Sequence, residues 1–198
     1  TITDIRFPML GDHNVQNCLA AIAVALEMNI KADSIRDALA DFGGVGRRFE
    51  TKGVSHGVTI IDDYGHHPVE INAALKAGRM MCGENKLIAV VQPHRYSRLA
   101  DLFVDFCGCF HDADEVLVAD VYAAGETPID DINRDSLVNG LRDHGHKAAS
   151  ALLHRYDLAA EIKARTSAGD LVMCLGAGDI TNWAATLPDE MEKLGDAE

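Results

Sequence analysis

The spacing of hydrophobic residues changes near residue 45. From His13 to Leu26 apolar residues recur at intervals of three and four, with Asp12 as a candidate N-terminal cap, which predicts a helix. A second helix is predicted over residues 34–41, because the glycines at 43 and 44 are typical of a helix end. The change of spacing at Val45-Gly46 predicts a domain boundary, with residues 1–45 on one side and 46–198 on the other.

Beyond residue 45, short apolar runs alternate with helical stretches. Strands are predicted at 48–51, 57–62, 86–91, 115–119 and 170–175, with a turn over 53–56. Helices are predicted at 68–81, 97–110, 135–143, 155–165 and from about residue 179. Continuous β-branched runs between helices are typical of a parallel sheet covered on both faces. The predicted fold class is therefore α/β, with a mainly parallel sheet and helices on both faces.

Polar residues gather directly after four of the predicted strands. They occupy Asp62–Pro68, Gln92–Arg98, Asp120–Glu126 and Gly176–Asp179. In open α/β sheets, ligands bind outside the carboxyl ends of the strands, so the four segments predict one small-molecule site.

Each segment also has a simpler interpretation. His66 and His67 are equally compatible with surface or helix-capping roles, and the glycines at 176 and 178 with a tight turn. Arg95 and Arg98 would form a solvated face, although cations at a helix start oppose the helix dipole. A bound carboxylate or phosphate would account for that placement.

Composition narrows the function classes. The chain has 198 residues, 47% of them hydrophobic, which favours a packed core over disorder. With 18 basic and 31 acidic residues its net charge is −13, which argues against a nucleic-acid or anionic-membrane binder. No apolar run approaches the roughly 18 residues of a membrane span. The five cysteines lie mostly in apolar runs and predict buried, reduced thiols in a cytoplasmic protein.

Several motifs are missing from the sequence. It contains no complete phosphate loop, dinucleotide fingerprint or nucleophile elbow. It begins with Thr1-Ile2 and has no secretory signal pattern, and the missing methionine led us to expect a piece of a longer chain. Cys107 and Cys109 have no second pair at zinc spacing, so no metal site is predicted.

Six motifs together resemble the Mur ligase family over nearly the whole chain. They are Gly11-Asp12-His13-Asn14-Val15-Gln16-Asn17, Phe42-Gly43-Gly44-Val45-Gly46-Arg47-Arg48-Phe49, Asp62-Asp63-Tyr64-Gly65-His66-His67-Pro68, Gln92-Pro93-His94-Arg95-Tyr96-Ser97-Arg98, Asp120-Val121-Tyr122-Ala123-Ala124-Gly125-Glu126 and Gly176-Ala177-Gly178-Asp179-Ile180. Murein tripeptide recycling ligases share the His-His-Pro element. Those enzymes carry Phe-Ala in place of Tyr64-Gly65 and lack the Pro-His-Arg-Tyr-Ser-Arg run, so this branch fits less well.

The resemblance implies a domain organisation and a reaction. Residues 1–45 would be the last helices of a central ATP-binding domain, and 46–198 a Rossmann-like C-terminal ligase domain. The reaction would join L-alanine to UDP-N-acetylmuramate at the expense of ATP, through an acyl phosphate, in peptidoglycan precursor synthesis. Mg would be held by ligands in the rest of the central domain, and the fragment alone would be inactive. Neither nucleic acid nor membrane is expected as a partner, and the oligomeric state is left open.

The resemblance also assigns roles to individual residues. The catalytic candidates are Arg48, which would reach the γ-phosphate, His66 and His94, with no general base chosen between the two histidines. The nucleotide would be contacted by His13 and Asn17 at the adenine, Asp63 at the ribose, and Arg48. The substrate pocket would be formed by Tyr64, His66, His94, Arg95, Arg98, Gly176, Ala177 and Gly178. Asp120, Tyr122 and Glu126 are weaker candidates for supporting roles.

Two hypotheses from other classes remain beside this one. One is an autonomous α/β module that binds a small anion or nucleotide. The other is a metal-dependent hydrolase built on Asp63, His66 and His67.

Overall fold

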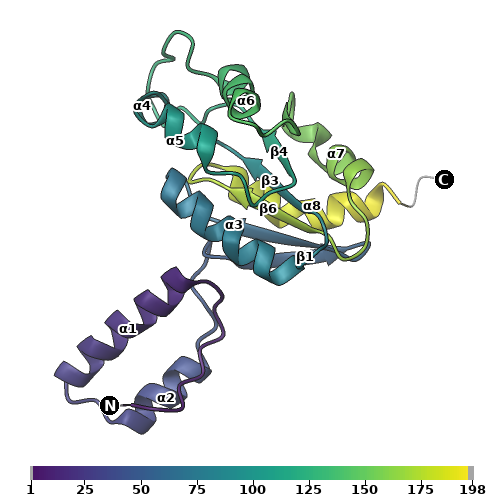
Figure 1. The fold of residues 1–198 in the computed structure, drawn as a ribbon. Helices are drawn as coiled ribbons and strands as arrows, with labels where there is room; N and C mark the ends of the chain where they lie inside the picture. Colours follow the sequence, from purple (N-terminus) through teal and green to yellow (C-terminus); the bar gives the residue numbers. More distant parts are fainter. Residues whose placement is uncertain (1, 196–198) are drawn as a thin grey trace. The chain divides into compact units, whose positions relative to one another are not determined.

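The computed structural model of the chain describes residues 2–195 (Figure 1). The chain divides into two compact units between Gly46 and Arg47. Each unit is described separately below.

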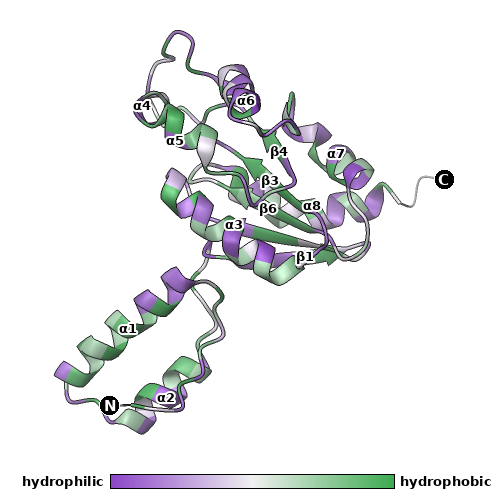
Figure 2. Cartoon of the chain, in the orientation of Figure 1, coloured by the Kyte–Doolittle hydropathy of each residue, from purple (hydrophilic) through white to green (hydrophobic). Residues whose placement is uncertain are grey.

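The first unit is a helical pair. Helix α1 spans Asp12–Glu27 and α2 spans Ala32–Ala40. Cys18 and Ile22 from α1 pack with Ile35 from α2 in a small apolar core. Gly11, rather than Asp12, is the N-cap residue of α1, and no side chain caps this helix. Figure 2 shows apolar colouring along much of α1, and several of its large apolar residues are exposed: Val15, Leu19, Val24 and Leu26.

The second unit is built on a six-stranded sheet in the order β1-β2-β6-β3-β4-β5. Its strands are β1 (Glu50–Ser55), β2 (Val58–Asp63), β3 (Leu87–Val91), β4 (Glu115–Val118), β5 (Ala149–Ala151) and β6 (Leu171–Leu175). Only β1 runs antiparallel to its neighbour β2, while all other neighbouring pairs are parallel. This confirms the predicted α/β class with a mainly parallel sheet.

Helices cover both faces of the sheet (Figure 1). They are α3 (Pro68–Cys82), α4 (Tyr96–Asp101), α5 (Phe103–Gly108), α6 (Arg134–Asp143), the short 3-10 helix η1 (Arg155–Asp157), α7 (Leu158–Arg165) and α8 (Ile180–Lys193). One apolar core joins the sheet to α3, α4, α5 and α6, and a second joins it to α7 and α8.

Successive side chains of the buried strands belong alternately to the two cores. In β2, Ile61 belongs to the first core and Ile60 to the second. In β3, Val91 and Val90 divide in the same way, because successive side chains of a strand point to opposite faces. The apolar runs of the sequence are therefore strands that are covered on both sides, as predicted.

The structure differs from the predicted elements in several places. The first strand extends to Ser55, and the hairpin turn lies at His56 and Gly57 instead of 53–56. Both turn residues have positive φ, 48° and 79°, which matches the tight turns that join twisted antiparallel strands. Strand β5 was not predicted, because the short Ala-Ser-Ala sequence has low strand propensity.

The helix predicted over 97–110 is instead two helices. It begins one residue earlier, at Tyr96, and is interrupted at Leu102, whose φ of −117° and ψ of 21° leave the helical range. Leu99 before the break and Phe106 after it both lie in the first core. The break therefore adjusts the direction of the chain while both sides stay packed on the sheet.

All five cysteines are buried free thiols, as the apolar context predicted. Burial raises the pKa of the Cys174 thiol to about 12, so it stays protonated near neutral pH. No helix within residues 2–195 combines the length and the apolarity that a membrane crossing requires.

The first prediction tests the core under α3. Leu75 is fully buried, whereas Met80 on the same helix is 71% exposed. We expect Leu75→Ala to lower the free energy of unfolding by about 2–5 kcal/mol, because it leaves a cavity. The matched control Met80→Ala should change it by less than about 0.5 kcal/mol. Urea unfolding followed by the fluorescence of Trp183, the single tryptophan, measures both variants. Equal effects of the two changes would contradict the assigned core.

Candidate functional site

The four polar segments lie at one edge of the sheet. They follow β2, β6, β3 and β4, which are consecutive neighbours and all parallel. The carboxyl ends of these strands therefore meet, and the predicted convergence of the segments is confirmed.

The segment after β2 is organised around Asp63. Its carboxylate is buried and accepts hydrogen bonds from the backbone N–H groups of Phe49 at 2.8 Å and Gly65 at 2.7 Å. A Cβ atom added to Gly65 would lie only 2.9 Å from this carboxylate, so the close approach requires glycine. Asp63 therefore fixes the backbone on both sides of Tyr64.

The two histidines of this segment have different surroundings. His67 is the N-cap residue of α3 and forms a capping box with Glu70, as the capping interpretation proposed for this histidine. His66 Nδ1 lies 2.9 Å from the Tyr64 carbonyl oxygen and 3.5 Å from Glu70 Oε2. Only His66 is also in ring contact with other site residues.

Four rings form a continuous row across three loops. Tyr64 and His66 meet edge to face at 5.1 Å between centroids, and His66 meets His94 at 5.9 Å. His94 is stacked on Tyr122 at 5.6 Å, with the rings nearly parallel. The row joins the segments after β2, β3 and β4, so the site candidates Tyr64, His66 and His94 lie together.

The surroundings of His94 hold its pKa below the ordinary value of histidine. Burial lowers its pKa, and the nearby charges of Arg98 and Arg95 and the His66 ring lower it further. The Arg98 guanidinium Nη1 lies 3.2 Å from His94 Nδ1 and 3.1 Å from the His94 carbonyl oxygen. A guanidinium can only donate, so His94 Nδ1 is the acceptor and carries no proton.

Arg95 and Arg98 lie at the start of α4, as predicted, but that helix start already has an anion. The Glu126 carboxylate accepts hydrogen bonds from the Ser97 backbone N–H and hydroxyl. A bound carboxylate or phosphate is therefore not required to offset these cations, which corrects the argument from the helix dipole.

The two arginines at the start of the second unit differ in how they are held. Arg47 Nη2 donates to the Gly176 carbonyl oxygen at 2.7 Å, and its Nε lies 3.6 Å from the fully buried carboxylate of Asp62. Arg48 has a 43% exposed side chain and forms an ion pair with Glu70 at 3.9 Å. Both guanidinium groups lie over the Tyr64 ring, at 4.7 Å and 5.4 Å. Arg47 is thus a structural tie, while Arg48 faces solvent beside the ring row.

The glycines of the segment after β6 allow close packing against Gln92. A Cβ on Gly176 would lie 2.7 Å from the Gln92 carbonyl oxygen, and one on Gly178 would overlap Gln92 Oε1. The buried Gln92 amide donates to Asp179 Oδ1 at 2.6 Å and accepts from the Ile180 N–H at 3.2 Å. The Gly176, Ala177 and Gly178 turn is therefore locked in place by Gln92.

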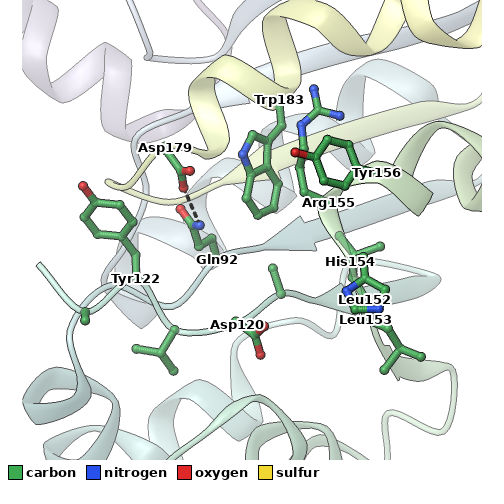
Figure 3. A pocket seen from close by; sticks show the side chains of 13 residues that line it. Gln92, Asp120, Tyr122, Leu152, Leu153, His154, Arg155, Tyr156, Asp179 and Trp183 are labelled. Atoms are coloured by element: carbon green, nitrogen blue, oxygen red, sulfur yellow. Dashed lines mark hydrogen bonds between the residues drawn. The ribbon is translucent and has the colours of Figure 1, made fainter. Parts of the chain in front are cut away.

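A cavity of about 370 Å³ opens beside this turn (Figure 3). Figure 3 shows Tyr122 and Trp183 on its walls, with the Gln92–Asp179 hydrogen bond between them. The segment Leu152–Tyr156 closes the other side. Tyr122 therefore belongs both to the cavity and to the row of rings.

The sequence did not indicate this cavity. Leu152–Tyr156 follows the unpredicted strand β5, so its place at the same edge could not be inferred. Trp183 was not proposed as a site residue, and Gln92 was included only as the first residue of the polar segment Gln92–Arg98, directly after an apolar strand.

The predicted adenine residues belong to the first unit. His13 and Asn17 lie four residues apart on α1, and Asn17 is exposed. Within residues 2–195 no three His, Cys, Asp or Glu side chains are placed to hold a metal ion. Asp63, His66 and His67 therefore do not form the centre that a metal-dependent hydrolase requires.

The fold and the polar edge define an α/β domain of the doubly covered parallel-sheet class, and comparison with known proteins gives its family. The family described as "Mur ligase, glutamate ligase domain" matches residues 47–178, and the chain belongs to this family. Among the curated relatives, the UDP-N-acetylmuramate–L-alanine ligase of Phenylobacterium zucineum is 60% identical over 191 residues, which cover 96% of this chain. The corresponding ligase of Ruegeria pomeroyi is 59% identical over 96% of the chain. The chain spans about 40% of the length of these relatives.

Solved structures give the same fold. The UDP-N-acetylmuramate–alanine ligase of Thermotoga maritima matches with a TM-score of 0.80 and 26% identity, over 97% of this chain and 40% of that one. A murein peptide ligase from Psychrobacter arcticus matches with a TM-score of 0.67 and 22% identity, over 95% of this chain and 38% of that one.

The second prediction concerns the pKa of His94. Arg98→Gln removes one of the cations that lower this pKa but leaves the burial, which is the larger cause. We therefore expect the pKa of His94 to rise toward 6.5 without reaching it. NMR titration of the imidazole signals measures the change, with Lys76→Ala on the outer face of α3 as the control. An unchanged or lower pKa in Arg98→Gln would contradict the arrangement.

Proposed function

We propose that the chain carries the C-terminal ligase part of an ATP-dependent enzyme that joins L-alanine to UDP-N-acetylmuramate in cytoplasmic peptidoglycan precursor synthesis. One observation carries the proposal. Arg48, His66, His94 and Arg98 gather at the carboxyl edge of the sheet in a chain about 60% identical to ligases with this name.

The reaction sets clear physical requirements. The γ-phosphoryl group of ATP passes to the muramoyl carboxylate, giving an acyl phosphate and ADP. The alanine amine then attacks the acyl carbon, the C–O bond to phosphate breaks, and an amide forms. Negative charge builds up on the transferring phosphoryl group, so a positioned cation lowers the barrier. The amine must also be held close to the acyl carbon.

The residues of the second unit fit these requirements. Arg48 has a 43% exposed side chain, with a 3.9 Å ion pair to Glu70, and would contact the γ-phosphate. Arg98 keeps its Nε and Nη2 donors for a substrate carboxylate, because only Nη1 bonds His94. Arg95, Tyr64 and the Gly176–Gly178 backbone would complete the substrate pocket. The imidazoles of His94 and His66 are the candidates to accept a proton from the amine, with no general base chosen between them.

The candidate nucleotide-binding residues meet these requirements less completely. Asp63 would contact the ribose hydroxyls, and His13 and Asn17 would present ring and amide groups to adenine. For Mg, residues 2–195 provide no fitting group of ligands, and no step is assigned to it here.

The third prediction tests the function in a chimeric enzyme. In the Phenylobacterium zucineum ligase, this chain replaces the matched 191 residues. We expect phosphate release that requires UDP-N-acetylmuramate, L-alanine and ATP together, with the 198 residues alone inactive. The activity of the unaltered relative, measured in parallel, is the control. A folded chimera that releases no phosphate with all three substrates would contradict the proposal, as would turnover by the isolated chain.

The fourth prediction separates substrate-facing cations from other surface charge. In the chimera, Arg48→Ala and Arg98→Ala should each lower kcat/KM by about 100-fold or more, because each removes a donor aimed at developing or bound negative charge. Lys76→Ala, an exposed cation on α3, should leave kcat/KM within about twofold. Steady-state kinetics with each substrate varied in turn measures the effect. Loss of activity of the same size in all three variants would contradict the roles assigned to Arg48 and Arg98.

A further inference from the structure

We propose that Glu126, in the loop after β4, is a positioning residue that sets the arginines at the start of α4. It acts on the start of α4 through Ser97, from the loop that also carries Tyr122. The inference rests on the proposed function only where it concerns catalysis, since the positioning itself is a property of this chain.

Helix α4 begins in a conformation that needs support. Its N-cap residue, Arg95, has a φ of 73° and no side-chain capping hydrogen bond. Positive φ is strained for a residue with a long side chain, and persists only where surrounding contacts enforce it. The first N–H groups of the helix also need an acceptor from elsewhere.

Glu126 supplies that acceptor from 29 residues further along the chain. Its Oε2 accepts from the Ser97 backbone N–H at 3.0 Å, and its Oε1 accepts from the Ser97 hydroxyl at 2.7 Å. This two-point contact is the role that an N-cap side chain normally plays. Arg95 cannot play it, because a guanidinium has no acceptor.

The same loop holds the other side of Arg95. The Arg95 backbone N–H donates to the Tyr122 carbonyl oxygen at 2.9 Å, and the Tyr122 N–H donates to the Pro93 carbonyl oxygen at 2.8 Å. The His94 ring is stacked on Tyr122. Residues 93–97 are thus fixed at one end by Tyr122 and at the other by Glu126.

Charge agrees with this geometry. The hydrogen bonds from Ser97 lower the pKa of Glu126, and the nearby charge of Arg95 lowers it further. Glu126 is therefore ionised at neutral pH and faces the positive start of α4. Its carboxylate therefore offsets the charge of Arg95 and fixes the backbone at the helix start from which Arg95 and Arg98 project.

The first test uses the 198-residue chain alone. We expect Glu126→Ala to speed hydrogen exchange of the Ser97 amide by about tenfold or more, because the amide loses its acceptor, and Glu126→Gln to give a smaller increase. Asp130→Asn, an exposed carboxylate in the same loop, is the matched control and should leave the exchange unchanged. Exchange at Ser97 that stays the same in Glu126→Ala would overturn the proposal.

The second test uses the chimera. Glu126→Ala should raise KM for an anionic substrate by about five- to tenfold, with a smaller fall in kcat and a melting temperature close to that of the unaltered chimera. Glu126→Gln should recover most of KM, and Asp130→Asn should match the unaltered chimera. A loss of melting temperature with kcat and KM unchanged would reduce Glu126 to a stabilising contact and overturn the positioning role. A chimera that makes no product would count against the proposed function, while the exchange result would still decide the positioning of α4.

Discussion

The parallel hydrogen bonding of β2, β6, β3 and β4 is the constraint on which the site depends. It places the ends of four strands along one edge, although their segments are separated by up to about a hundred residues in the chain. Because helices cover both faces of the sheet, the polar residues that follow each strand lie at this edge. The row of rings from Tyr64 to Tyr122 is a direct result of that order.

The loops at this edge are held by side-chain acceptors rather than by regular secondary structure. Asp63 accepts from backbone groups on both sides of Tyr64, Gln92 fixes the turn after β6, and Glu126 fixes the start of α4. Backbone N–H groups in irregular segments must find partners, and side chains at the strand ends provide them. Each of these three residues therefore orders a neighbour that is better placed to meet a substrate.

Most of the fold could be predicted because the apolar runs are unambiguous. Ile60 and Ile61 and the run Leu87–Val91 indicate strands covered on both faces whatever the tertiary context. Strand β5 and the break at Leu102 could not be predicted, since both are set by packing on the sheet. For the site, the ends of the predicted strands indicated where the polar residues gather. The sequence does not show which arginine the fold engages. Arg47 is held by Gly176, more than a hundred positions away, whereas within the described residues Arg48 has no such contact and stays more available.

The difference between arginines that the fold engages and arginines that it leaves available decides which positive charges can act at this edge of an acidic chain. Arg47 donates a hydrogen bond to the Gly176 carbonyl oxygen. Arg134 pairs with Asp120, and Arg155 pairs with Glu190 through both of its terminal nitrogens. A planar guanidinium that is already engaged by two acceptors has little left for a phosphate or carboxylate. Arg48 is ion-paired only at 3.9 Å, and within residues 2–195 Arg95 has no ion pair. The positive charge available at this edge is therefore set less by net charge than by which arginines the fold leaves without close acceptors.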